Sequence, residues 1–419
     1  MATHSVHGSS LNNIHSAQPG EQSFMARQPI MDAHNHVHGY ELLFWNGREP
    51  VPTAGSDAAT QAVLDGSLQQ GLERLARGLP AFVPCTADSL AHNWLQMLPP
   101  QLTVIELPAG TEPTPSLLAA CARLKEMGFW LAVDNFAGIA TPLTSLADYV
   151  KIDFAANDAA TRGVLLAKVR KPGTMLVARG VETREQFRSA AAEGFLLFQG
   201  YYFCHPEPLK GHRIPGNRLV HLEILELLQN DPFDLHRLSQ LVTCDASLTY
   251  RLLRLVNSPL CAMRQEVTSI QAALMLVGQE AFRRIATLAI AGDFNADQPA
   301  ELLRMAFVRG RFCELAAPLC HQPPAEQYLI GMVSLFPAML QVSMEELVRM
   351  LPLRQKASDA LRGRGNPEGA LLDWIAAYEH GNWAACDALA AANNLVSADL
   401  MRCHADALTW AETSMASAA

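Results

Sequence analysis

The chain has 419 residues, enough for two or three domains of ordinary size. Hydrophobic residues make up 49% and charged residues 17%, a balance that is typical of globular proteins and excludes a largely disordered chain. The 41 acidic and 32 basic residues give a net charge of -9. This charge argues against a protein that coats nucleic acid, because binding to many phosphates needs a clustered basic face.

Nine cysteines are scattered through the sequence, and none forms a Cys-X-X-Cys pair. An odd and dispersed set indicates reduced thiols rather than a disulfide framework. The N-terminus lacks the charged and apolar blocks of a secretory signal, and no run of about 20 apolar residues indicates a membrane span. We therefore expect a cytoplasmic protein that does not enter a membrane.

In the first half, short apolar runs alternate with stretches of helical spacing. Residues 1–22 show no apolar period, so we expect a flexible tail before a domain at 23–208. The expected strands are Gly39–Phe44, Ala81–Pro84, Leu102–Leu107, Phe129–Val133, Tyr149–Ile152, Thr174–Val177 and Phe195–Phe203. Strand–helix alternation of this kind predicts a parallel sheet or a (β/α) barrel.

Charged residues recur in or just after these apolar runs, at Glu41, Glu106, Asp134, Lys151 and Glu182. In a (β/α) barrel the carboxyl ends of the strands form the rim where chemistry takes place. Carboxylate oxygens suit Mg²⁺ or Mn²⁺, and two such ions can clamp an in-line phosphodiester displacement. Isolated acids after strands also serve as helix caps and loop residues, so both interpretations stay open.

After a segment at 209–217 with Gly211, Pro215 and Gly216, which we interpret as a linker, the strand pattern stops. Residues 218–410 show apolar residues at helical spacing, and we expect 411–419 to form a tail. The expected helices are Leu219–Leu228, Leu235–Cys244, Leu248–Val256, Ile270–Val277, Gln279–Ile290, Ala300–Leu315, Ala325–Leu340, Met344–Met350, Gly369–His380, Asn382–Asn393 and Ser397–Leu408.

Several segments of the first half match a known pattern in the right order. They are Gly39-Tyr-Glu-Leu-Leu-Phe, Val104-Ile-Glu-Leu, Val133-Asp-Asn-Phe-Ala, Val150-Lys-Ile-Asp, Ala178-Arg-Gly-Val-Glu-Thr and Gln199-Gly-Tyr-Tyr-Phe-Cys-His-Pro. They resemble the EAL type of cyclic di-GMP phosphodiesterase, as found in bacterial EAL-HDOD signalling proteins. The resemblance implies metal ligands at Glu41, Glu106 and Asp134. It implies catalytic roles for Glu41, Lys151 and Glu182, and ligand contacts at Gln199 and Arg179.

Four residues depart from the pattern of active EAL enzymes. Trp45 stands in place of a phosphate-contacting arginine, and Pro84 in place of an asparagine ligand. Asn135 replaces an aspartate, and Arg179 replaces a glutamate beside the implied metal pair. Opposite unit charges ~4 Å apart attract by ~4 kcal/mol at an effective dielectric near 20, so reversing one sign costs at least that order. We therefore expect a degenerate domain with vacant metal positions and no catalysis.

The second half resembles an HDOD domain in the stretches that begin at Asp245 and Val267. HDOD domains are similar to HD phosphohydrolases, which bind metal through a His-Asp pair. Here the corresponding place holds Ser334 and Leu335, which cannot replace that pair as ligands. The resemblance therefore implies no catalysis from this half either.

The expected architecture is α/β plus all-α, an EAL-like (β/α) barrel followed by an HDOD helical domain. We expect a non-catalytic adaptor in cyclic di-GMP signalling, whose HDOD domain contacts protein partners. The alternatives are a weak metal-dependent phosphodiesterase and a cyclic di-GMP receptor without turnover. We expect no cofactor, with Mg or Mn only if a residual phosphodiesterase site is occupied. Nucleic acid is not an expected partner, and a homodimer is a candidate assembly.

Overall fold

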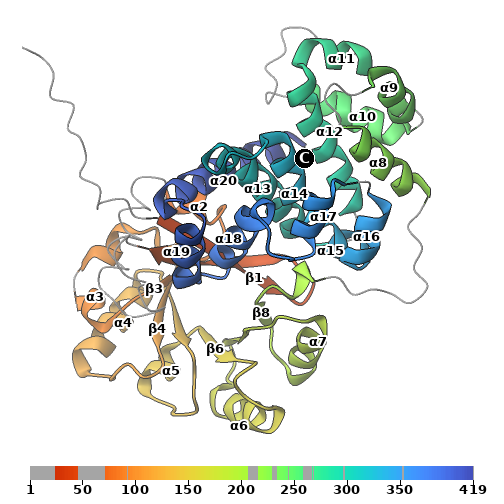
Figure 1. Ribbon diagram of the computed structural model, residues 1–419. Helices are drawn as coiled ribbons and strands as arrows, with labels where there is room; N and C mark the ends of the chain where they lie inside the picture. The colour runs from red at the N-terminus through yellow and green to blue at the C-terminus, as the bar shows by residue number, and fades with distance from the viewer. Residues whose placement is uncertain are drawn as a thin grey trace, which may run out of the picture.

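The computed structural model describes residues 24–45, 71–91, 93–205, 216–228, 234–243, 245–257, 267, 269–295, 298–351 and 353–418. The expected N-terminal tail at 1–22 lies outside these residues. So does the expected linker at 209–217, except for Gly216 and Asn217, which begin the first helix of the second half. Figure 1 shows a barrel formed by the first half and a group of helices formed by the second.

Eight strands close into a barrel in chain order. They are β1 Phe24–Asp32, β2 Val37–Trp45, β3 Ala81–Pro84, β4 Thr103–Pro108, β5 Trp130–Asp134, β6 Tyr149–Asp153, β7 Met175–Arg179 and β8 Leu197–Gln199. Strand β1 runs antiparallel to both of its neighbours, β2 and β8, and the other strand pairs are parallel. The expected barrel is confirmed. Strand β1 was not predicted, because Arg27-Gln28-Pro29 interrupts its apolar pattern.

The described helices of the first half are α2 Leu72–Leu75, α3 Ala87–Ala91, α4 Pro115–Glu126, α5 Pro142–Leu146, α6 Ala159–Val169 and α7 Arg184–Glu193. The three longest helices begin at residues whose side-chain oxygens accept a backbone N–H three positions later. These caps are Thr114, Asp158 and Thr183. Such capping satisfies an N–H that would otherwise lack a partner in the first turn. The caps fix where each helix starts after its strand.

The barrel interior has an apolar layer beneath a polar layer. The apolar layer consists of Ile30, Phe82, Val104, Ala132, Tyr149, Val177 and Leu197. Because side chains alternate across a strand, the residue two positions later points to the same interior, one step nearer the strand's carboxyl end. On β3 to β8 the residues at these later positions are Pro84, Glu106, Asp134, Lys151, Arg179 and Gln199. Simple alternation therefore gathers the candidate site residues at one end of the barrel, called here the mouth.

The second half is helical throughout its described residues. Its helices are α8 Gly216–Leu227, α9 Leu235–Thr243, α10 Ala246–Val256, α11 Ile270–Val277, α12 Gln279–Phe294, α13 Ala300–Ala316, α14 Pro324–Val333, α15 Phe336–Leu340, α16 Met344–Met350, α17 Gln355–Leu361, α18 Ala370–Glu379, α19 Trp383–Ala392 and α20 Ser397–Ala418. In the described part of the chain, no helix is long and apolar enough to cross a membrane.

Two expectations for this half are corrected. The stretch Ala325–Leu340, expected as one helix, is two helices separated at Ser334 and Leu335, and Pro337 lies in the first turn of the second. Proline fits a first turn but removes the N–H that a continuing helix needs. The expected tail at 411–419 is helical as far as Ala418, because α20 packs Ala407 and Ala411 into the core.

The two halves share one continuous apolar core. Helices α13, α18 and α20 lie against the outer side of β1 and β2, whereas α8 to α11 lie at the far end of the helical half (Figure 1). Tyr40 donates a hydrogen bond to Glu301 in α13 at 3.0 Å. Arg27 pairs with Glu412 in α20 at 2.8 Å. The helical half is therefore packed against the barrel through buried apolar and charged contacts.

Candidate functional site

A buried lysine lies at the centre of the barrel mouth. Lys151 Nζ lies 2.7 Å from Glu41 Oε2 and 2.6 Å from Glu106 Oε1. All three residues are at most 4% exposed. Beneath the ammonium, the ring of Phe82 in the apolar layer lies with its centroid 5.1 Å away. The sequence-predicted residues Glu41, Glu106 and Lys151 are thus brought together as one closely contacting group.

A second cation closes the rim of the mouth. Arg179 NH1 donates to Asp134 Oδ2 at 2.9 Å, and the arginine side chain keeps 29% of its surface exposed. The pKa of Arg179 is raised, because the carboxylates of Asp134, Glu41 and Glu106 outweigh the opposing effect of burial. The arginine therefore acts as a fixed positive charge among these acids.

A hydrogen-bonded pair of amides completes the mouth on the β1 side. Gln199 Nε2 donates to Gln28 Oε1 at 2.8 Å and also to Glu41 Oε2. Gln28 lies opposite Glu41 in the β1–β2 register. We did not predict Gln28 as a site residue, and the signal that could have found it is its place next to the EAL-like strand in an antiparallel hairpin.

The candidate Glu182 and the departing residue Asn135 take no part in the contacts that hold this cluster. Glu182 is half-buried beyond the end of β7, where its backbone N–H donates to Gln186 Oε1 at 2.8 Å. Asn135 is exposed and has a φ of 53°, in the left-handed region that asparagine tolerates better than most residues. Pro84 lies beside Glu106 in the strand register and offers no side-chain oxygen.

Burial and charge divide the two glutamates of the mouth into different protonation states. Burial alone would raise the pKa of Glu41, but Lys151 and Arg179 and two hydrogen bonds hold it below its ordinary value. Burial, together with the charges of Glu41 and Asp134, raises the pKa of Glu106 to about 8 in spite of Lys151. At neutral pH the mouth thus holds an ionised Glu41 and a protonated Glu106 beside the ammonium of Lys151.

The residues of the mouth do not fit a pair of divalent cations. Three buried oxygens lack a hydrogen-bond partner, namely Glu106 Oε2, Asp134 Oδ1 and Gln199 Oε1, and oxygens of this kind could face a cation. However, an ammonium and a guanidinium already neutralise the carboxylates, and a nearby divalent ion would be repelled by both. In the described residues, no group of three or more His, Cys, Asp and Glu side chains is arranged to hold a metal ion.

The place expected for a His-Asp pair in the helical half is held by an arginine network. Ser334 accepts a hydrogen bond from Arg309 NH1 at 3.1 Å and donates to Gly331 O at 2.7 Å. Arg309 also makes a two-pronged ion pair with Glu379, with nitrogen–oxygen distances of 2.9 and 2.6 Å. Leu335, the second residue of that place, is buried in the apolar core. Sequence reasoning missed Arg309 and Glu379, which are far apart in the chain.

Two family models match the chain in sequence. The EAL domain model matches residues 12–206, and the HDOD domain model matches residues 214–334. The order of the two matches is the order expected from the motifs.

Two curated proteins are similar over most of the chain. The uncharacterized protein YuxH of Bacillus subtilis is 32% identical over 94% of this chain and 98% of its own length. The cyclic di-GMP phosphodiesterase CdgJ of Vibrio cholerae is 32% identical over 86% of each chain. Among solved structures, the PaMucR phosphodiesterase in complex with c-di-GMP is 24% identical. That match covers 48% of this chain and 100% of that chain, with a TM-score of 0.37.

Proposed function

Because this chain belongs to the family in which an EAL domain is followed by an HDOD domain, we propose that it is a non-catalytic adaptor in cyclic di-GMP signalling. The single observation that carries this proposal is the neutralised barrel mouth. Lys151 lies within 2.7 Å of both Glu41 and Glu106, and Arg179 pairs with Asp134, so two cations lie among the three carboxyl groups that would hold the metal of an active enzyme.

Without a metal pair, the mouth lacks the means to activate a water and to stabilise the charge of a phosphodiester displacement. Lys151 cannot take over as a general base, because its contacts with the carboxyl groups of Glu106 and Glu41 outweigh the effect of burial, raise its pKa and keep it protonated. Glu106 holds a proton at neutral pH but lies 1% exposed behind the lysine. The chemistry of the mouth therefore favours a structural or binding role over turnover.

The proposal assigns the output to the helical half, which would contact protein partners. Helix α11 supports this assignment, because Met275 and Leu276 are 79% and 61% exposed at the end of the molecule far from the barrel. Adjacent exposed apolar side chains are typical of protein contact sites. A second copy of the chain is one such partner, and light scattering across concentrations tests that assembly.

The second candidate is a weak phosphodiesterase or a cyclic di-GMP receptor, and two observations favour it. The Vibrio relative is named a cyclic di-GMP phosphodiesterase. The mouth also keeps three buried oxygens without hydrogen-bond partners, at Glu106, Asp134 and Gln199. A ligand that displaced Arg179 from Asp134 would expose these oxygens to a cation.

Calorimetric titration of the purified full chain with cyclic di-GMP in Mn²⁺, followed by chromatography for the linear product, tests the proposal. An adaptor that works by protein contacts gives no product. Heat without product identifies a receptor. Product that forms in the native protein and disappears in Glu41→Gln overturns the non-catalytic proposal, and Glu185→Gln on exposed α7 is the matched control.

A further inference from the structure

A largely buried path of contacts joins the barrel mouth to Ser334, at the place expected for a His-Asp pair. It begins at Gln199, which bonds Glu41 in the mouth, and continues two residues later at Tyr201. The Tyr201 hydroxyl donates to the backbone carbonyl of Glu379 at the end of α18. The Glu379 carboxylate pairs with Arg309 in α13, and Arg309 donates to Ser334.

The contacts of Tyr201 and of the Arg309–Glu379 pair are buried, and the hydrogen bond from Arg309 to Ser334 is partly buried. Tyr201 is 2% exposed, and burial together with the Glu379 charge raises its pKa well above the ordinary value, so its hydroxyl remains a donor. Glu379 and Arg309 are 8% and 9% exposed. A two-pronged ion pair in such surroundings fixes both side chains, because neither charge can be released into water.

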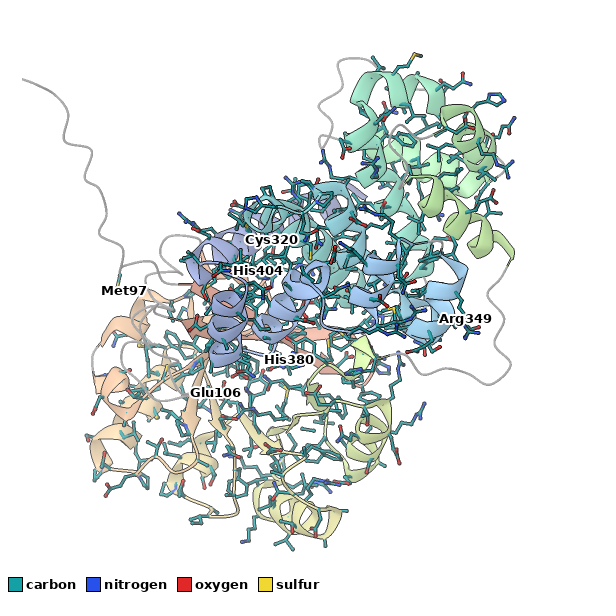
Figure 2. All side chains as sticks on the ribbon, viewed as in Figure 1. Met97, Glu106, Cys320, Arg349, His380 and His404 are labelled. Carbon is teal, nitrogen blue, oxygen red and sulfur yellow. The ribbon has the colours of Figure 1, made fainter. Side chains whose placement is uncertain are left out.

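The turn between α18 and α19 gives the path a second contact with the barrel, next to the mouth. The rings of His380 and Tyr201 are in contact, with centroids 4.3 Å apart and planes tilted by 40°, on the side of the helical half that faces the barrel (Figure 2). Gly381 has a φ of 66°, and an added Cβ there would lie 2.8 Å from Leu43 Cδ1. Leu43 and Tyr201 each stand two residues after a mouth residue, Glu41 and Gln199 respectively.

Gly331 allows α13 and α14 to approach each other closely at the Ser334 end of the path. A Cβ on Gly331 would lie 2.5 Å from the backbone oxygen of Arg309, so α13 and α14 can approach this closely only with glycine there. The close approach places Ser334 within hydrogen-bond reach of Arg309. A shift of Arg309 would therefore alter its hydrogen bond to Ser334 at the α14–α15 junction.

We propose that Tyr201, Glu379 and Arg309 form a relay that couples the barrel mouth to the α14–α15 junction of the helical half. A change in the mouth moves Gln199 and Tyr201, and the ion pair transmits that movement across the domain boundary. The three relay residues are positioning residues. The inference rests on the proposed function only in taking the mouth as the place where a signal enters.

Hydrogen exchange on the full chain tests the relay without any ligand. Glu41→Gln removes the charge that Lys151 and Gln199 contact, and it should change the protection of the α14 amides, Pro324–Val333, roughly fivefold or more. In a Tyr201→Phe background the same substitution should leave α14 protection unchanged. Helix α6, Ala159–Val169, is the internal reference, because global destabilisation would lower protection there as well.

Asp148→Asn is the matched control, since it removes a barrel ion pair with Lys125 that has no place on the path. Equal effects of Glu41→Gln on α14 with and without the Tyr201 hydroxyl would overturn the relay, and so would no effect in either background. Because no ligand is used, a failed cyclic di-GMP titration leaves the relay untouched. If Glu41→Gln does not change hydrogen exchange in α14, the relay fails, but the proposal of a non-catalytic adaptor is unaffected.

Discussion

Lys151 Nζ lies 2.6 Å from Glu106 Oε1 in the barrel mouth, and both side chains are at most 1% exposed. Two buried groups this close depend on each other, because removing one leaves the other without a counter-charge or hydrogen-bond partner. Glu41 depends on the same ammonium at 2.7 Å. The mouth therefore behaves as a structural element of the barrel, and its substitutions have consequences for stability that can be measured.

Lys151→Met should destabilise the fold by about 3–5 kcal/mol at neutral pH, because it leaves the Glu41 carboxylate buried and unpaired. Urea denaturation followed by circular dichroism measures the change. Lys125→Met is the control, since Lys125 and Asp148 are a more exposed pair whose loss should cost less than about 1 kcal/mol. Equal losses in the two variants would contradict the assignment of Lys151 as the central counter-charge.

The contribution of Glu106 to stability should fall as pH rises from about 5 to 8. Its carboxyl keeps a proton in the folded state up to a pKa of about 8, whereas the unfolded chain releases it near the ordinary value of 4.5. The folded state thus binds more protons in this window, and each pH unit can cost up to about 1.4 kcal/mol. Glu41 acts in the opposite direction and only at lower pH, since its pKa is lowered.

Glu106→Gln separates these contributions, because glutamine keeps the shape of the protonated acid and cannot release a proton. Relative to this variant, the native protein should lose stability between pH 5 and 8, because groups such as His404, whose pKa is lowered by burial, act equally on both proteins. A difference between the two proteins that stays constant with pH would assign the titration to another group.

Arg179→Glu combined with Asn135→Asp should raise the affinity of the mouth for a divalent cation. Exchanging a cation for an anion at ~4 Å from a divalent ion favours binding by at least ~4 kcal/mol at an effective dielectric near 20, or roughly a thousandfold. Calorimetry with Mn²⁺ alone measures the gain, and a rise in thermal stability on adding Mn²⁺ confirms that the folded state binds it. Lys168→Glu, an exposed charge reversal on α6, should leave Mn²⁺ affinity unchanged.

The sequence predicted the barrel and most of the mouth because both follow from alternation along strands. Val104 and Glu106, or Tyr149 and Lys151, show the pattern of one interior apolar residue followed two positions later by a charge. Parallel strands bring such positions to one end of the barrel. The identity of Glu41, Glu106, Asp134 and Lys151 as mouth residues could therefore be predicted, whereas their pairing required coordinates.

The contacts between the halves could not be predicted in the same way. Arg27 and Glu412 are 385 positions apart, and no local pattern connects them. Arg309 and Glu379 lie in helices whose apolar spacing is satisfied without them. Arg27 also interrupts the apolar run of β1. The same residue that joins β1 to α20 therefore made the strand hard to predict from its apolar pattern.

Gly331→Ala should destabilise the helical half by about 1–3 kcal/mol, because the added methyl group would lie 2.5 Å from the backbone oxygen of Arg309. Gly292→Ala in α12 is a matched control, since nothing lies within 4 Å of its added Cβ. Alanine is the better helix former, so this control should gain about 0.5–1 kcal/mol. Urea denaturation measures the free energy of unfolding of both variants. We expect it to fall in Gly331→Ala and to rise in Gly292→Ala.

The end of α20 should contribute to the stability of the barrel through Glu412. Its carboxylate pairs with Arg27, a guanidinium whose pKa is lowered by burial and by the nearby charge of Arg304. Glu412→Gln should cost about 2 kcal/mol, less than for a fully buried pair, because the Glu412 side chain is 20% exposed. Asp399→Asn breaks an exposed pair on the same helix and should cost less than about 1 kcal/mol.

Deleting residues 411–419, which include Glu412, should lower the protection of the β1 amides against hydrogen exchange. Unchanged protection would mean that the last residues of α20 do not stabilise the barrel.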